Sequence, residues 1–175
     1  GSPRSYWDWQ SRSMVRPEAY RWFSGTAPEH MIFGLREALD MLAEEGLDAA
    51  FARHARLGDA TRAAVDAWSS AGGMEINAVV PAQRAESITT IRVAEGMDVK
   101  QFQGILRDRF NVAVGGGLGQ LEGKAFRIGH MGDINEPMIL GTLASVEATF
   151  KILGIAHGEG ALPAAIASLA AAHKQ

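Results

Sequence analysis

The chain has 175 residues, of which 47% are hydrophobic and 21% are charged, and its formal net charge at pH 7 is -3. These values predict one globular domain with a sizeable core, and the lack of any long block of like charge argues against a nucleic-acid partner. The sequence has no cysteine and no apolar run near the ~20 residues of a membrane span, which excludes disulfides, thiolate metal sites and a membrane-spanning helix.

The N-terminal segment is rich in aromatic residues but shows no helical period. Its aromatic side chains are Tyr6, Trp7, Trp9, Tyr20, Trp22 and Phe23. We expect residues 1–27 to form an irregular linker that packs on a surface this segment alone does not create. A strap across the domain's own core is an equally good interpretation. Because no signal-peptide pattern opens the sequence, we expect a cytoplasmic protein.

Two helices are predicted between Pro28 and the Gly72-Gly73 pair. Their apolar residues recur at helical spacing, and Gly46 separates the two runs. The runs are Met31, Ile32, Leu35, Leu39 and Leu42, then Leu47, Phe51, Leu57, Val65 and Trp68.

Strands and helices then alternate. β-branched runs predict strands at 76–80 and 87–93, and Asp98 is expected to cap a helix that contains Phe102 and Phe110. The sheet is predicted to resume at 111–114 and again in the strand that carries Arg127. A last pair of helices is expected, one opened by Asn135-Glu136-Pro137 and closed by Gly154, the other Ala-rich and spanning 159–173.

This order predicts an α+β fold, with a mostly antiparallel sheet that helices cover on one side. Residues 28–155 would form the domain and residues 156–175 a C-terminal helical tail.

The glycine-rich segment 115–124 does not match a phosphate-binding loop. Leu118 stands where the first glycine of such a loop is needed, and Ala125 replaces the metal-binding serine or threonine. A flexible hairpin connection between two strands is the better interpretation. The five histidines show no i, i+4 pairing, so no metal site is predicted, and no role is predicted for His130.

Arg127 lies inside the short apolar run Phe126–Ile128, directly before a glycine-punctuated turn. Because removing water from an unpaired guanidinium is costly, such an arginine needs an anionic or backbone partner. Composition alone favours an internal Asp or Glu. The alternative is a ligand carboxylate that the guanidinium holds with two parallel hydrogen bonds.

Three groups of residues resemble those of a known enzyme family. They are Phe33–Leu39 with Glu45–Leu47, Gly116–Gly119 with Gly123-Lys124, and Phe126–Glu136. In order and spacing, from about Tyr6 to Leu153, the sequence resembles the C-terminal half of the serine-glyoxylate and alanine-glyoxylate aminotransferases. These are class V, fold-type I enzymes that use pyridoxal 5'-phosphate. The resemblance implies the small domain of that fold, a homodimer, and amino acids and 2-oxo acids as substrates, with glyoxylate as the amino acceptor.

The resemblance implies a role for two residues. Arg127 occupies the place of the arginine that grips the substrate carboxylate, and Thr26 that of the threonine whose hydroxyl contacts the cofactor phosphate of the neighbouring subunit. An N-cap hydroxyl for the helix near Pro28 is the structural alternative for Thr26. The sequence departs from the family where Phe23 replaces a frequent tyrosine and where Glu29-His30 replaces apolar residues.

In the family, the lysine that forms the Schiff base with the cofactor lies in a serine-rich stretch. No lysine of this chain lies in such a stretch, so no catalytic residue is assigned. The lysines are Lys100, Lys124, Lys151 and Lys174. We expect the chain to be inactive by itself, not to bind pyridoxal phosphate, and to lack the large domain of a whole enzyme. Two alternatives stay open, namely an assembly module that pairs with a separate large domain and another class V reaction, such as a lyase or pyridoxamine-pyruvate transamination.

Overall fold

The computed structural model describes residues 26–174, which divide after Leu47 into two compact units. In the first unit, helix α2 spans Glu29–Glu45 and has no buried residue. Helix α3 spans Leu47–Ser69 and lies almost wholly in the second unit. The predicted break between the two helices is confirmed, because Gly46 adopts a φ of 83°, which a glycine accepts without strain.

The second unit contains one four-stranded sheet in the order β1-β2-β4-β3, and every neighbouring pair is antiparallel. The strands are β1 (Met74–Ile76), β2 (Ile88–Val93), β3 (Gly115–Gly116) and β4 (Ala125–Gly129). The central pair brings Ile91 opposite Phe126 and Thr90 opposite Arg127. This register decides which side chains share a face with Arg127, because side chains alternate along a strand.

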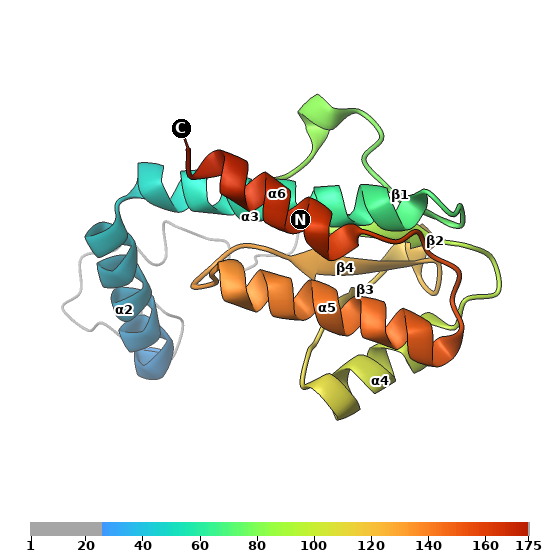
Figure 1. The fold of residues 1–175 in the computed structure, drawn as a ribbon. Helices are drawn as coiled ribbons and strands as arrows, with labels where there is room; N and C mark the ends of the chain where they lie inside the picture. The colour runs from blue at the N-terminus through green and yellow to red at the C-terminus, as the bar shows by residue number, and fades with distance from the viewer. Residues whose placement is uncertain (1–25, 175) are drawn as a thin grey trace, which may run out of the picture. The chain divides into compact units, whose positions relative to one another are not determined.

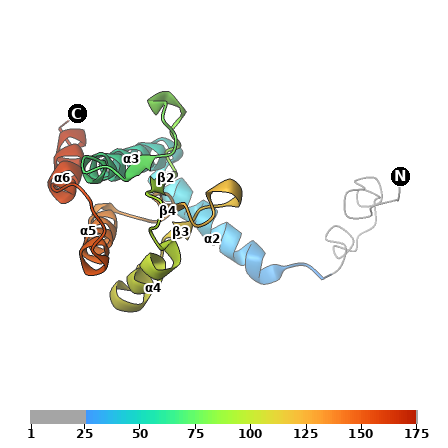
Figure 2. The ribbon, with the colours of Figure 1, turned by 90° about the vertical axis from the view of Figure 1, so that its right-hand side faces the viewer.

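Helices cover one face of this sheet (Figures 1 and 2). They are α3, α4 (Val99–Phe110), α5 (Glu136–Leu153) and α6 (Ala161–Ala172). The core lies between them and the sheet, with Phe102, Phe126 and Phe150 fully buried and their ring centroids within 4.8 to 6.3 Å of one another. The predicted α+β fold, antiparallel sheet and one-sided helix layer are confirmed.

Local sequence signals set several of the helix ends. The Asp98 carboxylate accepts a hydrogen bond from the Gln101 backbone N–H at the start of α4, and the Asn135 side chain does the same for Met138 at the start of α5. Gly154 ends α5 in the left-handed conformation. Helix α6 contributes Ala161, Ala165 and Leu169 to the core of the second unit.

Two predicted strands differ from the structure. The strand predicted at 76–80 is instead β1, which starts and ends earlier, and a short 3-10 turn occupies Pro81–Gln83. The strand predicted at 111–114 is wrong, because Asn111 takes the left-handed conformation that caps α4 and pairing starts only at Gly115. Glycine carries no strand propensity, so the true strand gave no signal. In the described part of the chain, no helix is long and apolar enough to cross a membrane.

Candidate functional site

Arg127 points from β4 to the sheet face that the helices leave uncovered. Its neighbours Phe126 and Ile128 are buried in the core, so alternation places the Arg127 side chain on the opposite face, where it is half-buried. Thr90 of β2 and Gly115 of β3 lie directly opposite it in the two flanking strands.

Gly115 leaves room for the guanidinium. A Cβ atom at this position would lie 3.1 Å from Nε and 3.2 Å from Nη2 of Arg127, closer than almost any side-chain carbon approaches a neighbour. The guanidinium therefore lies over the backbone of β3, where a larger residue would displace it.

The backbone of β3 also holds one end of the guanidinium. Arg127 Nε donates a hydrogen bond of 2.7 Å to the carbonyl oxygen of Gly116. Within residues 26–174, neither Nη group has an acceptor and no carboxylate lies within ion-pairing distance of Arg127. The described residues thus leave two parallel N–H donors for another group, which is the arrangement that binds a carboxylate with two hydrogen bonds.

Arg62 shows how a guanidinium is satisfied internally in the same domain. It is 8% exposed and donates to Asp59 at 2.7 Å and to Glu86 at 2.9 Å. The sequence alternative for Arg127 was this kind of ion pair, and the described residues provide none. The burial of Arg62 was not predicted from the sequence.

Backbone contacts hold the glycine segment that follows β3 in one conformation. Gly117 N–H donates to the Ala125 carbonyl oxygen at 2.8 Å, and a Cβ atom on Gly117 would overlap the carbonyl group of Leu121. A short 3-10 turn at Gly119–Leu121 completes the connection to β4. The segment is therefore a hairpin connection, as the sequence predicted, and its glycines fit close backbone contacts.

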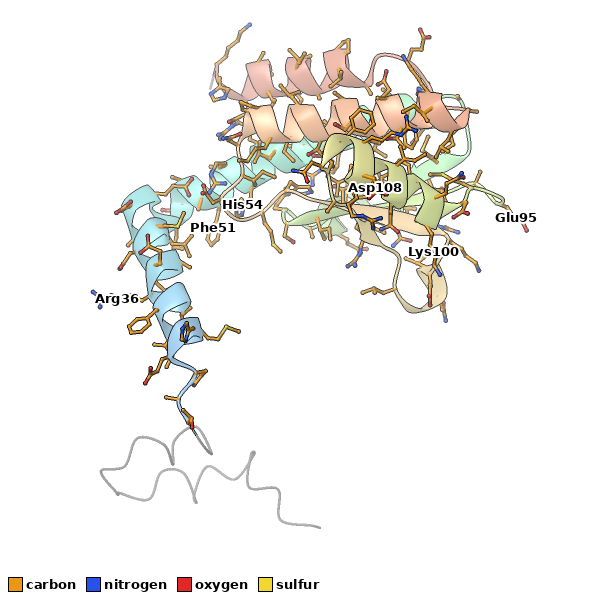
Figure 3. The ribbon with its side chains drawn as sticks, turned by 90° about the horizontal axis from the view of Figure 1, so that it is seen from below. Arg36, Phe51, His54, Glu95, Lys100 and Asp108 are labelled. Carbon is orange, nitrogen blue, oxygen red and sulfur yellow. The ribbon has the colours of Figure 1, made fainter. Side chains whose placement is uncertain are left out.

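Contacts with α3 fix the segment after β4. Arg53 Nη1 donates to the carbonyl oxygens of Gly132 and Ile134 at 2.7 and 2.8 Å, and His54 Nε2 accepts from Gly132 N–H at 3.1 Å. Figure 3 labels His54 on this helix. The glycine-punctuated turn after Arg127 is thus attached to the helix layer.

His130 belongs to the core and not to the site. Its ring is fully buried, Nε2 lies 3.0 Å from Thr89 Oγ1, and Nδ1 lies 3.1 Å from the Glu86 carbonyl oxygen. Burial lowers the pKa of His130, so the neutral ring is favoured. The residue follows Ile128 on the core face, opposite the face of Arg127.

Thr26 lies in the first unit, exposed, in a bend before α2. The N-cap of that helix is Pro28, with no side-chain hydrogen bond, so Thr26 does not cap it. Glu29 and His30 are exposed in the first turn of α2, and Phe23 lies outside the described residues. In the described part of the chain, no cluster of His, Asp or Glu could hold a metal ion.

The aminotransferase class-V family model matches residues 8–122 of the sequence. The chain belongs to the class-V aminotransferases. This match ends before β4, so it does not extend to Arg127. Class-V aminotransferases depend on pyridoxal phosphate, which supplies the electron sink for their chemistry.

Similarity to individual class-V proteins extends over most of the chain. It is 41% identical over 165 residues to the serine–glyoxylate aminotransferase of Methylorubrum extorquens, which covers 94% of this chain and 40% of that protein. The structure matches the pyridoxamine-pyruvate aminotransferase of Mesorhizobium loti with a TM-score of 0.76 and 31% identity, over 83% of this chain and 37% of that one. It matches the ureidoglycine-glyoxylate aminotransferase of Bacillus subtilis with a TM-score of 0.78 and 25% identity, over 94% of this chain and 42% of that one. The chain thus spans about 40% of the length of these relatives.

The residues of this class-V chain fit only part of a pyridoxal phosphate site. Within residues 26–174, the Nη donors of Arg127 have the arrangement that a carboxylate requires, and Thr26, in the first unit, is exposed. A reactive lysine does not fit, because Lys100, labelled in Figure 3, lies on α4 and Lys151 lies on α5. Both helices belong to the layer that covers the other face of the sheet (Figure 1). Lys174 follows α6, and Lys124 lies exposed in the turn before β4.

Proposed function

We propose that the chain supplies the substrate-carboxylate-binding part of a pyridoxal phosphate-dependent aminotransferase. The enzyme would move an amino group from serine, alanine or a similar amino acid to glyoxylate or a related 2-oxo acid. The observation that carries this proposal is the guanidinium of Arg127, which is anchored through Nε and whose Nη groups have no acceptor among residues 26–174.

The chemistry of the substrates supports the role of Arg127. Every α-amino acid and every 2-oxo acid has a carboxylate next to the reacting carbon, so one carboxylate-binding group serves both half-reactions. A planar guanidinium fixes both oxygens of that carboxylate and thereby fixes the orientation of the neighbouring carbon. An arginine that kept an internal carboxylate partner would first have to release it.

The activities of these relatives support glyoxylate as the acceptor. Two of the three proteins described above are glyoxylate aminotransferases, but their donors, serine and ureidoglycine, differ. We therefore leave the donor open between serine, alanine and similar amino acids. The working enzyme would be a cytoplasmic homodimer in which Thr26 contacts the cofactor phosphate of the neighbouring subunit.

The substitution Arg127→Ala tests this proposal in the enzyme that contains the chain. We expect KM for the amino acid and the 2-oxo acid to rise about tenfold or more, the equivalent of a lost charge-assisted hydrogen bond, while the absorbance of bound cofactor stays unchanged. The control is Arg107→Ala, which removes an exposed guanidinium that pairs with Asp108 on α4. An unchanged KM in the Arg127 variant would reject the role.

Pyridoxamine-pyruvate transamination is a second candidate, because a solved enzyme of that activity matches the structure. The same arginine would then bind the carboxylate of pyruvate. Product analysis with alanine, serine and aspartate as donors, and with pyridoxamine, distinguishes the two reactions.

A further inference from the structure

The orientation of Arg127 depends on a very short strand. Strand β3 consists of two glycines and lies at the edge of the sheet, where β4 is its only partner among residues 26–174. Glycine has the largest conformational freedom of any residue, so a Gly-Gly-Gly segment needs outside contacts to hold one conformation. Because Gly116 provides the acceptor for Arg127 Nε, any contact that fixes β3 also fixes the guanidinium.

Gln103 on α4 makes such a contact. Its Nε2 donates a hydrogen bond of 2.8 Å to the carbonyl oxygen of Val114, the residue before β3. Its amide also lies close to Gly116, since a Cβ atom at Gly116 would be 3.6 Å from Nε2 and 3.7 Å from Oε1. One side-chain amide therefore contacts β3 from the helix side.

We propose that Gln103 is a positioning residue for Arg127 and acts through residues 114–116. Without the Nε2 donor, the glycine strand would sample other conformations, and the Gly116 carbonyl oxygen would no longer stay under Arg127 Nε. The consequence for substrate binding rests on the proposed function, but the structural coupling between Gln103 and Arg127 does not.

Nuclear magnetic resonance of the ¹⁵N-labelled chain tests the coupling directly. The Arg127 Nε–H signal, identified by its loss in Arg127→Lys, should be protected from solvent exchange in the unchanged chain. In Gln103→Glu, which keeps the shape but has no N–H donor at neutral pH, we expect this protection to be lost. The matched control is Gln101→Glu, the same change at an exposed position of α4, which should leave the signal intact.

A second variant and a kinetic measurement complete the test. Gln103→Met removes the donor without adding charge, so it replaces Gln103→Glu if that variant does not fold. In the whole enzyme, either Gln103 variant should raise KM for both substrates with kcat and cofactor absorbance unchanged. A protected Arg127 signal in a folded Gln103 variant overturns the proposal. If Arg127→Ala leaves KM unchanged, the proposed function fails instead, and the resonance experiment alone decides whether Gln103 positions Arg127.

Discussion

Gly115 lies directly opposite Arg127 on the neighbouring strand, and the guanidinium occupies the space that a side chain at position 115 would fill. The atoms that a Cβ would meet all belong to the far end of a flexible side chain. The fold itself therefore tolerates a larger residue at position 115, whereas the orientation of Arg127 does not.

The substitution Gly115→Ala is expected to separate function from stability. The guanidinium must move by a few tenths of an ångström, so KM for the carboxylate substrates should rise several-fold in the whole enzyme. The free energy of unfolding should be unchanged or higher by ~0.5–1 kcal/mol, because alanine has less backbone freedom to lose than glycine. Denaturant unfolding and steady-state kinetics measure the two effects, and an unchanged KM would show that Gly115 does not constrain Arg127.

Gly117→Ala, in contrast, should lower the stability of the fold. Its Cβ would overlap the backbone of Leu121, which cannot move aside as a side chain does, so we expect a loss of about 1–3 kcal/mol in the free energy of unfolding. The control is Gly104→Ala in helix α4, where nothing lies within 4 Å of the added carbon. That change should stabilise the chain by ~0.5–1 kcal/mol, from helix propensity. Equal stability of the two variants would contradict the predicted closure of the 117–121 turn.

His130 predicts a pH dependence of stability. Burial lowers its pKa in the folded chain below the ordinary 6.5, and nearby Arg62 and His54 act in the same direction while Glu86 opposes them. The unfolded chain therefore binds the proton more readily. The contribution of the neutral His130 ring to the free energy of unfolding is complete above pH 6.5 and declines as the pH falls below that value.

The measurement compares the unchanged chain with His130→Gln about one unit above and one unit below pH 6.5. The variant removes the titrating ring, so its free energy of unfolding should fall less on acidification. Identical pH slopes would mean that His130 is not held neutral in the folded state.

Glu136 should cause a second pH dependence of stability, at more acidic pH. A hydrogen bond from its own backbone N–H, and then those from Arg56 at 2.8 and 3.1 Å, lower the pKa of Glu136 below 4.5. Its stabilising contribution is thus present above pH 4.5 and is lost as the pH falls through the folded pKa. Glu136→Gln should cost ~1 kcal/mol near neutral pH, because the carboxylate also lies in the first turn of α5. The measurement is thermal unfolding, in which Glu122→Gln, on an exposed turn, should cost much less.

The chain alone should not retain pyridoxal phosphate. One carboxylate-binding arginine and one hydroxyl are too few contacts for the cofactor, and no lysine is placed to react with it. A titration followed in the near-ultraviolet and visible range should show only free cofactor, and borohydride should leave the chain mass unchanged. A reducible adduct on Lys124 would contradict this expectation.

The parts of the fold that the sequence predicted depend on local signals. The Asp98 and Asn135 caps, the glycine stops and the apolar stripes of the helices each involve residues within a few positions of one another. The existence of β3 could not be predicted in this way, because two glycines have no strand signal and pair only through contacts with a strand ten residues further on.

The candidate site shows the same division. The sequence singled out Arg127 as a candidate because a cation inside an apolar strand is unusual. The roles of Gly115 and Gln103 were missed, because they depend on the register between β3 and β4 and on how α4 lies against that strand. A run of glycines just upstream of an isolated strand arginine was the available signal, and only the structure shows that the two belong together.

The lengths of the outer strands have a consequence for self-association. β1 has three residues and β3 has two, whereas the inner strands have six and five. A strand added at either edge of the sheet could pair with very few backbone amides. At the β3 edge it would also have no side chains to pack against, because both residues of β3 are glycines. The sheet is thereby poorly suited to growth by strand addition, the usual route from a native β-structure to fibrils.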